Sequence, residues 1–412
     1  MSVFVTTGLP SSASALQPID VFVESARAHN PRNQEVRANR AEADAQASEA
    51  FSRALPILSA AASYTRNQWD VSFSGLSVLP RNELDASATL SVPLVDLAKF
   101  ARISAADHAA EAAQHQQNAT ARAVEAEVVQ LYYQLAADLA LVAVARKAFD
   151  VTRMDLKLTE EAASAGTAAA LDVARARAEV EQRSQQVIGA QLAVSLTAQA
   201  LASRTGIRPD VATSVELVDD LHAEPPLDQF LAGTSATPVV VAAATAREAA
   251  ERNASAQRLV LVPTLGAAVV ERYTNATGFL NGHHEAYAAS LTLGWSIDFG
   301  TSPAIRARNA EALAAKARED EVRLTVVDAI EQAFRTIEAN IARSKSARAQ
   351  SVASARAAEI ARARYRSGET TQLDLLQADR DDLAAEVARI QADGDLLNAR
   401  RQLRLASGSG AP

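Results

Sequence analysis

The chain contains Gly166-Thr-Ala-Ala-Ala-Leu-Asp-Val173 and, 202 residues later (368 − 166), Gly368-Glu-Thr-Thr-Gln-Leu-Asp-Leu375. The same offset relates three further pairs: Asp96 and Asp298, Leu201 and Leu403, Gly206 and Gly408. Recurrence at a fixed offset indicates an internal duplication, in which one unit was built once and doubled. We therefore expect a single architecture made of two similar halves.

The composition favours long helices. Of the 412 residues, 48% are apolar, with alanine prominent, but only 4% are aromatic. Alanine is the best helix former, and its small side chain lets neighbouring helices approach closely. The net charge of −8 gives no general attraction for nucleic acid, which is therefore not an expected partner. The sequence contains no cysteine, which excludes disulfides and thiol catalysis.

Each half also contains two stretches in which apolar and polar residues alternate, the pattern of half-buried strands. We expect strands at about 57–66 and 84–95 in the first half and at about 264–273 and 286–298 in the second. The segment Asn67–Arg81 between the first two is expected to be a loop. Four strands are too few to close a barrel, and open sheet edges aggregate. The strands therefore predict association with other subunits.

A long helical hairpin follows each strand pair. The hairpins are expected over about 98–204, with a tip near Gly166, and over about 304–406, with a tip near Gly368. In the first hairpin, four apolar residues recur every seven positions: Val180, Val187, Val194 and Leu201. Sustained heptads predict coiled-coil packing. A shorter helix is expected before the first strand, from Ile19 to about Leu55, with Asn30-Pro31 as a candidate break.

These elements predict how the chain is divided. Residues 1–15 are a disordered tail or the remainder of a signal peptide, since Ala13-Ser-Ala15 fits a cleavage site. Repeat one covers 16–206, a linker covers 207–238, repeat two covers 239–408, and a disordered tail covers 409–412. No apolar run approaches the roughly 20 residues that a transmembrane helix needs. The protein is therefore expected either to be soluble or to cross a membrane by strands.

Three stretches resemble a known family. Tyr365-Arg-Ser-Gly-Glu-Thr-Thr-Gln-Leu-Asp374 and Ala165-Gly-Thr167 look like the hairpin tips of the TolC-like outer-membrane efflux family. Pro93-Leu-Val-Asp96 looks like its strand-to-helix junction, although the equivalent Trp295-Ser-Ile-Asp298 lacks the proline. The order of helix, strand pair and hairpin, repeated over about 16–408, is similar to that family as well.

The resemblance implies a mainly helical homotrimer. A 12-stranded β-barrel in the outer membrane would continue as an α-helical coiled-coil tunnel in the periplasm. Such an assembly is the passive exit duct of a tripartite efflux or type I secretion system and needs no cofactor. Its implied partners are outer-membrane lipid, a periplasmic adaptor (membrane fusion protein) and, through the adaptor, an inner-membrane pump.

Two other classes of protein remain open. A soluble coiled-coil scaffold would explain the helices but not the paired strands, and a periplasmic adaptor usually has one hairpin and compact β-domains. Detergent dependence would separate a channel from both. The sequence has no phosphate loop, Ser/His/Asp set or catalytic carboxylate pair, so no enzyme is expected. His283 and His284 lack a nearby acidic cluster, so no metal site is expected.

The glycine at each hairpin tip has a structural cause, because reversing a helix requires a residue with positive φ. The resemblance adds that both tips contact the adaptor. The residues that it assigns to this contact are Ala165, Gly166, Thr167, Ser367, Gly368 and Glu369.

By the same resemblance, Asp374 and Gln377 correspond to the constriction at the tunnel entrance, where a ring of carboxylates would repel anions. Asp374 can equally be an acidic residue that the helix dipole favours in a first turn. Asp172 and Tyr365 match a pair that holds the entrance closed, the tyrosine hydroxyl donating to the carboxylate. A basic member of that network corresponds to Thr370, so part of it is missing.

Overall fold

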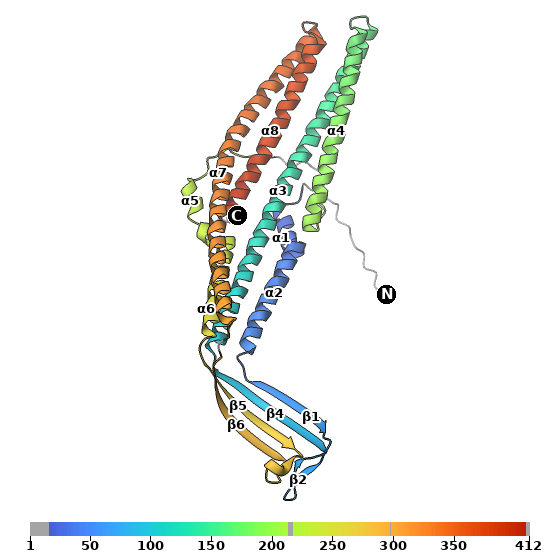
Figure 1. Ribbon diagram of the computed structural model, residues 1–412. Helices are drawn as coiled ribbons and strands as arrows, with labels where there is room; N and C mark the ends of the chain where they lie inside the picture. Colours follow the sequence, from blue (N-terminus) through green and yellow to red (C-terminus); the bar gives the residue numbers. More distant parts are fainter. Residues whose placement is uncertain (1–15, 213–216, 297, 409–412) are drawn as a thin grey trace, which may run out of the picture. The chain divides into compact units, whose positions relative to one another are not determined.

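Figure 1 shows the computed structural model of the protein, which describes residues 16–212, 217–296 and 298–408. The chain divides into two compact units. The first, here called the hairpin unit, combines 1–36, 117–238 and 323–412; the second, the sheet unit, combines 37–116 and 239–322. Each unit draws on corresponding parts of both repeats, because equivalent elements pack together. The compact units therefore do not follow the repeat boundaries.

The elements follow the duplicated order. Repeat one contains α1 (Ile19–His29), α2 (Pro31–Ser52), β1 (Ile57–Arg66), β2 (Val71–Phe73), β3 (Leu76–Leu79), β4 (Asn82–Val95), α3 (Leu97–Ser164) and α4 (Ala170–Thr205). The linker contains α5 (Leu227–Leu231) and the 3-10 helix η1 (Thr234–Ala236). Repeat two contains α6 (Pro238–Leu259), β5 (Thr264–Thr274), η2 (Thr277–Phe279), β6 (Glu285–Gly294), α7 (Thr301–Ser367) and α8 (Gln372–Ser407). This mainly helical fold with a small sheet confirms the expected class.

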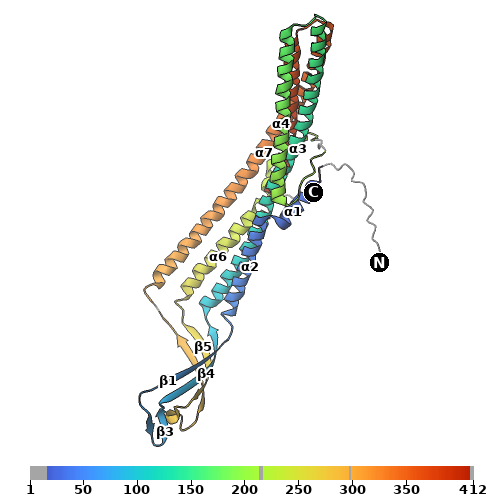
Figure 2. The same cartoon turned by 90° about the vertical axis from the view of Figure 1, so that its right-hand side faces the viewer.

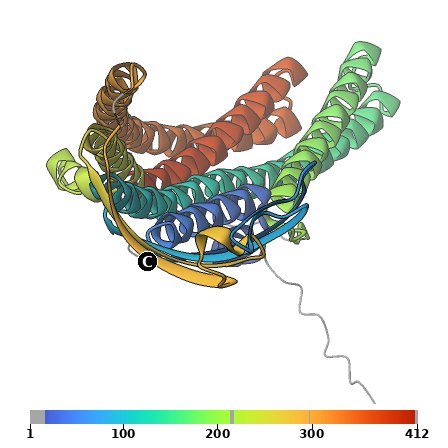
Figure 3. The same cartoon turned by 60° about the horizontal axis from the view of Figure 1, so that its bottom comes forward.

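The long strands form one antiparallel sheet in the order β1-β4-β5-β6. The sheet joins the two repeats, because β4 of the first pairs with β5 of the second, with Leu90 opposite Val269. Figure 3 shows that this sheet is curved. Its edge strands β1 and β6 have no further partner strand among the described residues.

The sheet has one apolar and one polar face. On the first, Leu58 lies opposite Leu90, which lies opposite Val269. The other face carries small polar side chains, such as Ser59 opposite Thr89. Successive side chains of a strand alternate between faces, so the alternating sequence gathers its apolar residues on one side. Leu58, Leu90 and Val269 are exposed in the single chain, so this face is suited to an apolar environment.

The segment between β1 and β4 contains a second, two-stranded sheet, so the expectation of a plain loop at Asn67–Arg81 was wrong. Strands of three and four residues are too short for alternation to reveal them in a sequence. This small hairpin lies close against η2. A Cβ added to Gly278 would lie 2.6 Å from the Val78 side chain, so only glycine fits there.

The helix expected from Ile19 to about Leu55 is divided into two helices at the candidate break, Asn30-Pro31. The Asn30 side-chain amide donates to the Arg204 carbonyl oxygen, and its side-chain oxygen accepts from the Arg32 backbone N–H, both at 3.0 Å. Pro31 then begins α2, a position where its missing N–H costs nothing. The buried amide fixes the break.

Strand β6 ends at Gly294, whereas the sequence predicted a strand to about residue 298. Its partner strand β5 begins at Thr264, opposite Gly294, so no β5 residue continues the ladder beyond that pair. The Trp295 indole N–H donates to the Leu261 carbonyl oxygen at 3.0 Å. Ile297 and the tails predicted at 1–15 and 409–412 lie outside the described residues.

The hairpin unit contains long parts of α3, α4, α7 and α8, which Figure 2 shows running side by side. Two clusters of buried apolar side chains hold it together. The first, around α3, includes Val128 and Leu135 and also Ile390 from α8. The second, around α7, includes Ile337 and Leu403. The three- and four-residue spacing of such side chains along each helix produces these buried faces.

Two helical stretches, Leu97–Ser164 and Leu227–Leu259, are long and apolar enough by length and composition to cross a membrane, although none was expected. In the first, the apolar residues include Val128 and Leu135, which are buried in the helical core. The second is interrupted between α5 and α6. Core packing explains the hydropathy of the first stretch, and the second is not one continuous helix. We therefore assign neither to a membrane.

Helix α8 packs on α3 at a glycine. A Cβ added to Gly394 would lie 3.4 Å from the Ala137 Cβ and 3.6 Å from Leu217 Cδ1. Nearby, the Gln402 side-chain amide donates to the Ala126 carbonyl oxygen at 2.8 Å. Small residues let the two helices approach closely, so this contact attaches the second hairpin to the first within one chain.

Buried charges clasp the linker to α8. The Arg400 guanidinium contacts the Asp219 carboxylate at 2.8 Å and also donates to the Glu224 carboxylate and the His222 carbonyl oxygen. From α7, Arg348 donates to the Asp219 carbonyl oxygen at 2.9 Å. The Arg400 side chain is only 6% exposed. These acceptors therefore satisfy a cation that water hardly reaches.

Candidate functional site: the hairpin tips

Both hairpins reverse through the same turn. Gly166 has φ of 79° and Gly368 has φ of 78°, in the left-handed region that favours glycine. The backbone N–H of Thr167 donates to the Ala162 carbonyl oxygen, and that of Glu369 donates to the Arg364 carbonyl oxygen, each at 2.9 Å. These bonds satisfy carbonyl groups that the ending helices leave open. The structural cause expected for the two glycines is thus present.

The six residues that the resemblance assigned to adaptor contact lie at these two turns and are exposed. They are Ala165, Gly166 and Thr167 at one tip and Ser367, Gly368 and Glu369 at the other. Nothing within 4 Å would meet a Cβ added to either glycine, so the turns are open to a partner on that side.

The helices that leave the two turns begin differently. At the start of α8, the Thr371 hydroxyl accepts from the Asp374 backbone N–H at 3.2 Å, and the Asp374 carboxylate accepts from the Thr371 backbone N–H at 3.2 Å. This is a complete capping box. At the start of α4, the equivalent cap is Ala169, whose methyl side chain cannot accept a hydrogen bond, and its backbone N–H donates weakly to the Asp172 carboxylate at 3.4 Å.

Asp374 and Gln377, which the resemblance assigned to the entrance, are both exposed. Hydrogen bonds from the Thr371 and Thr370 hydroxyls, together with the Thr371 backbone N–H, lower the pKa of Asp374. The carboxylate is therefore charged at neutral pH. Gln377 donates to the Asp381 carboxylate at 2.9 Å. Asp374 caps α8 within the single chain. This role alone explains an aspartate at the position, whether or not three copies form a ring of carboxylates.

Asp172 and Tyr365 are not joined within the described chain. The Asp172 carboxylate lies 3.8 Å from the Arg175 guanidinium, and the Asp172 backbone carbonyl oxygen accepts from the Gln372 side-chain amide at 3.0 Å. That last bond connects the start of α4 to the start of α8. The expected tyrosine–carboxylate bond therefore remains a prediction for an assembly of several chains.

A buried ion cluster near the tips was missed in the sequence. Glu179 is 2% exposed and pairs with Arg183, itself 4% exposed, at 3.0 Å on α4. Arg380 of α8 donates to the same carboxylate, with Nε at 3.2 Å. The carboxylate thus ties the two hairpins together. Arg and Glu four residues apart suggested only a solvated helix face, because the sequence does not reveal which helix covers them.

A second missed cluster surrounds Asp379. Arg362 of α7 contacts its carboxylate at 2.7 Å, while Asp155 of α3 acts on it as a like charge. Burial, reinforced by Asp155, outweighs Arg362 and raises the pKa of Asp379 to about 6. Burial also raises the pKa of Asp155. This part of the hairpin unit is therefore sensitive to protons.

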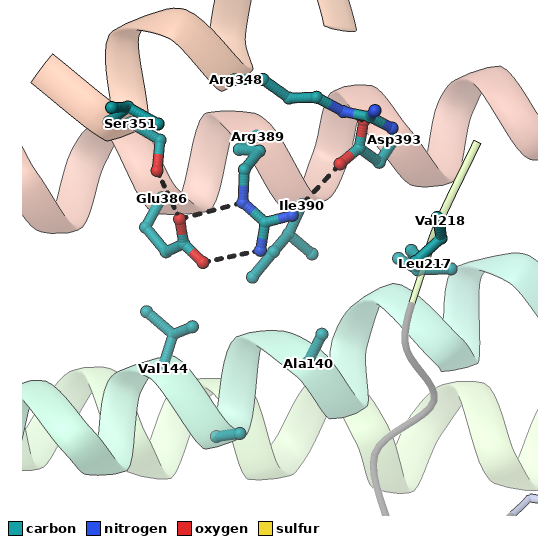
Figure 4. Close-up of a pocket in the computed structure, with 12 residues that line it drawn as sticks. Ala140, Val144, Leu217, Val218, Arg348, Ser351, Glu386, Arg389, Ile390 and Asp393 are labelled. Atoms are coloured by element: carbon teal, nitrogen blue, oxygen red, sulfur yellow. Dashed lines mark hydrogen bonds and ion pairs between the residues drawn. The ribbon is translucent and has the colours of Figure 1, made fainter. Parts of the chain in front are cut away.

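A hollow of about 720 Å³ lies between α3 and the α7–α8 pair. Figure 4 shows the residues that line it. One wall is apolar and includes Ala140 and Val144. On the other wall, Arg389 donates to Glu386 at 2.7 Å and to Asp393 at 3.2 Å. Arg348 also donates to the Asp393 carboxylate, at 2.9 Å, so the two guanidinium groups neutralise the two carboxylates. The hollow therefore offers no unpaired group among them that would select a charged ligand.

Asp219, Asp220 and His222 have the residue types of a metal site and lie close together. His222 Nε2 lies 3.0 Å from Arg400 Nη1, and Asp219 pairs with the same guanidinium. A cation would have to compete with that buried positive charge. We therefore assign the cluster to the linker clasp.

A duplicated chain that combines a curved sheet with two long hairpins has the architecture of outer-membrane ducts. A family model described as outer membrane efflux protein matches residues 22–206 and 235–409, and the chain belongs to this family. Its two matched segments agree with the duplication, and the resemblance drawn from the tips is confirmed. Membership places the protein in the outer membrane and favours a channel over a soluble scaffold. The comparison with curated proteins finds no match.

Solved channels have the same fold. The outer-membrane channel OprN is 24% identical, with a TM-score of 0.83 over 95% of this chain and 90% of that one. The CmeC outer membrane channel of Campylobacter jejuni is 19% identical, with a TM-score of 0.81 over 96% and 86%. The MtrE outer membrane channel of Neisseria gonorrhoeae, in its open state, is 19% identical, with a TM-score of 0.77 over 98% and 93%.

Proposed function

We propose that this protein is the exit duct of a tripartite efflux or type I secretion system, acting as a passive homotrimeric channel without catalytic activity. The proposal rests on family membership and on one observation. A helix face that is covered in repeat two is bare in repeat one.

The covered face belongs to α8. Ile390 is buried, and Gly394 packs against Ala137 of α3. Subtracting the offset of 202 gives the equivalent positions in α4, which are Ile188 (390 − 202) and Leu192 (394 − 202). Both side chains are exposed, Leu192 to 57%. The first hairpin therefore presents an apolar face that no described part of the chain covers.

The duplication indicates what covers that face. Since α3 covers α8, the equivalent cover for α4 is α7, supplied by another copy of the chain. Ala137 of α3 corresponds to Ala339 of α7 (137 + 202), and Ala339 is exposed. The two surfaces differ, so the contact is head-to-tail, and repeating it by rotation closes a ring.

The sheet supports the same assembly. Its edges are β1 and β6, so β1 of one copy can pair with β6 of the next. Three four-stranded sheets would give twelve strands, enough to close a barrel around a lumen. The apolar face would then contact lipid, and the polar face would line the lumen.

Cysteine crosslinking tests this ring. The sequence contains no cysteine, so Leu192→Cys combined with Ala339→Cys supplies only introduced thiols. Oxidation in outer membranes is expected to give covalent dimers and trimers. The two single variants and the pair Leu192→Cys with Glu338→Cys are controls that should crosslink far less. Monomer alone from the first pair would overturn the proposed interface.

Conductance tests the channel itself. Detergent-extracted protein is expected to have the mass of a trimer and to give discrete single-channel currents in a planar bilayer. A soluble, detergent-independent monomer or dimer without conductance would overturn the proposed function.

At the tips, we propose contact with a periplasmic adaptor and, through it, an inner-membrane pump. The exposed turns at Gly166 and Gly368 support this, because both are open to a partner. Thiols introduced by Thr167→Cys and Glu369→Cys should crosslink to a co-expressed adaptor. Failure at both tips would count against the contact.

At the entrance, we propose that Asp374 and Gln377 line the constriction and that Asp172 and Tyr365 hold it closed in the trimer. The exposure of Asp374 and its lowered pKa support a charged ring. Asp172→Ala combined with Tyr365→Phe is expected to raise single-channel conductance. An unchanged conductance would remove this latch from the proposal.

A further inference from the structure

The polar face of the large sheet carries charge only near one end. Among the residues of the four described strands β1, β4, β5 and β6, three charged side chains lie on this face: Glu83, Asp85 and Arg272. The other residues of the face are uncharged, mainly Ser, Thr, Ala and Gly. Any charge preference of a lumen lined by this face therefore arises at this level of the strands.

Asp85 and Arg272 form an ion pair across β4 and β5. Arg272 Nε and Nη2 both donate to Asp85 Oδ1, at 3.0 and 2.7 Å. Ser87 lies directly opposite Arg272, so the pair is diagonal between neighbouring strands. The arginine side chain is 54% exposed and the aspartate 23%. The guanidinium is thus the group that this pair presents to solvent.

The surrounding backbone is held independently of the ion pair. The Asn275 side chain accepts from the Leu84 backbone N–H at 2.8 Å and donates to the Asn82 carbonyl oxygen at 2.7 Å. Asn67 donates to the Glu83 carboxylate at 3.1 Å. Since an exposed ion pair adds little to stability, replacing one of its charges should alter the local field more than the fold.

We propose that Arg272 and Asp85 set the charge that the barrel lumen presents at this level and so adjust the ion selectivity of the channel, in series with the carboxylates proposed at the entrance. The inference rests on the proposed function, because three copies of the pair face a common lumen only in a closed barrel. Asp85 holds the Arg272 guanidinium against the wall and neutralises it. Together with Glu83, this level carries a net charge of −1 per chain. Without Asp85 the net charge would be zero and the lumen would admit anions more readily; without Arg272, Asp85 and Glu83 would attract cations more strongly.

The test is the reversal potential of the trimer in a planar bilayer under a KCl gradient. Asp85→Asn is expected to shift the cation-to-anion permeability ratio about twofold toward anions, and Arg272→Gln about twofold toward cations. The double variant should return close to the unmodified protein, because one charge of each sign is removed. At 1 M KCl all shifts should shrink, since the Debye length is only about 3 Å.

Modification after assembly removes the risk that a variant fails to fold. Arg272→Cys can be labelled in the finished channel with a positively or a negatively charged thiol reagent, because the chain has no other cysteine. The two labels should shift the ratio in opposite directions. Equal ratios for all proteins, or shifts of one sign, would overturn this inference and leave the channel intact. A wild-type protein without current would instead overturn the proposed function.

Discussion

The two hairpins carry the same ion pair with its charges exchanged. Glu160 of α3 pairs with Arg177 of α4 at 2.8 Å, and Arg362 of α7 pairs with Asp379 of α8 at 2.7 Å. The offset relates both positions, because 160 + 202 = 362 and 177 + 202 = 379. The first pair is solvent-exposed, whereas Asp379 is 12% exposed and lies close to Asp155. The fold therefore sets where an ion pair joins the two helices of each hairpin, and the surroundings set how strongly that pair interacts.

The same contrast extends along both hairpins. Helix α8 is covered within the chain, while the equivalent face of α4 is bare at Leu192. Helix α4 also buries an ion pair, Glu179 with Arg183, whose equivalents in α8 are the exposed Asp381 (179 + 202) and the buried but uncharged Ala385 (183 + 202). This face of α8 is thus covered within its own chain, and the equivalent face of α4 is left to bind another copy. Five sets of substitutions test this difference between the hairpins.

Removal of the Glu179 carboxylate should have the largest effect. Glu179→Ala leaves Arg183 buried without its partner and also removes the tie to Arg380 of α8. We expect a loss of about 3–5 kcal/mol in the free energy of unfolding. Urea denaturation at fixed protein concentration measures it. Asp381→Ala, at the equivalent exposed position of α8, should change stability by less than about 0.5 kcal/mol. Equal losses would contradict the contrast.

Gly394 should tolerate one methyl group and no more. Gly394→Leu would overpack the contact with Ala137 and is expected to cost about 1–3 kcal/mol. Gly394→Ala should be neutral or stabilising by up to about 1 kcal/mol, because its Cβ fits at ordinary contact distance and alanine favours helix. The same denaturation assay separates them. A leucine as stable as glycine would show that α8 does not pack on α3 at this point.

The next change tests the proton sensitivity of the second hairpin. The folded pKa of Asp379, about 6, lies above the unfolded value, so the folded state binds the proton more tightly. The stability from this group is therefore full at acid pH and is lost as pH rises through about 6.

Asp379→Asn cannot ionise, so its thermal midpoint should match the wild type at about pH 4 and exceed it at about pH 8. Asp381→Asn, on an exposed site of the same helix, should show no such difference between the two pH values. A constant gap between Asp379→Asn and wild type at both pH values would contradict a raised pKa for the Asp379 carboxyl.

Exchanging the helix caps should make the two tips alike. Thr371→Ala removes the hydroxyl that accepts from the Asp374 N–H and is expected to cost about 1 kcal/mol. Ala169→Thr introduces the missing hydroxyl at the start of α4 and should stabilise by roughly 0.5–1 kcal/mol. Hydrogen exchange of the first-turn amides reports each effect locally. If neither change alters the hydrogen-exchange rates of these amides, the difference between the two caps contributes nothing to helix stability.

The smallest effect is expected at the exposed tie of the first hairpin. Glu160→Gln should cost only about 0.2–1 kcal/mol, because water screens the pair with Arg177. The loss should vanish at high salt. A salt-independent loss above about 2 kcal/mol would mean that another chain buries this pair in the assembly.

The sequence predicted those parts of the fold that depend on local patterns. The offset of 202 located both tips, since positive-φ glycines stand at both copies, Gly166 and Gly368. Alternation located the long strands, but β2 and β3 were too short to leave a pattern. The local sequence also marked the break between α1 and α2 at Asn30-Pro31, but not the hydrogen bond from Asn30 to the Arg204 carbonyl oxygen, a contact over 174 residues that no local pattern encodes.

The ion clusters near the tips were less predictable. Glu179 and Arg183 have the spacing of an ordinary solvated pair, and only the packing of α8 reveals that they are buried. The exchanged pair could have been found, because aligning the repeats places Glu160 over Arg362 and Arg177 over Asp379. Reversal of sign at two positions together indicates that they touch.

The linker clasp has a consequence for timing. Asp219 binds Arg348, which follows it by 129 residues, and Arg400, which follows it by 181 residues. A chain delivered N-terminus first can close its first hairpin early, because that hairpin uses neighbouring segments. The linker can form its ion pairs only when almost the whole chain is present. The contacts of Arg400 therefore form late, and the conformation of the linker is not fixed until the second hairpin has folded.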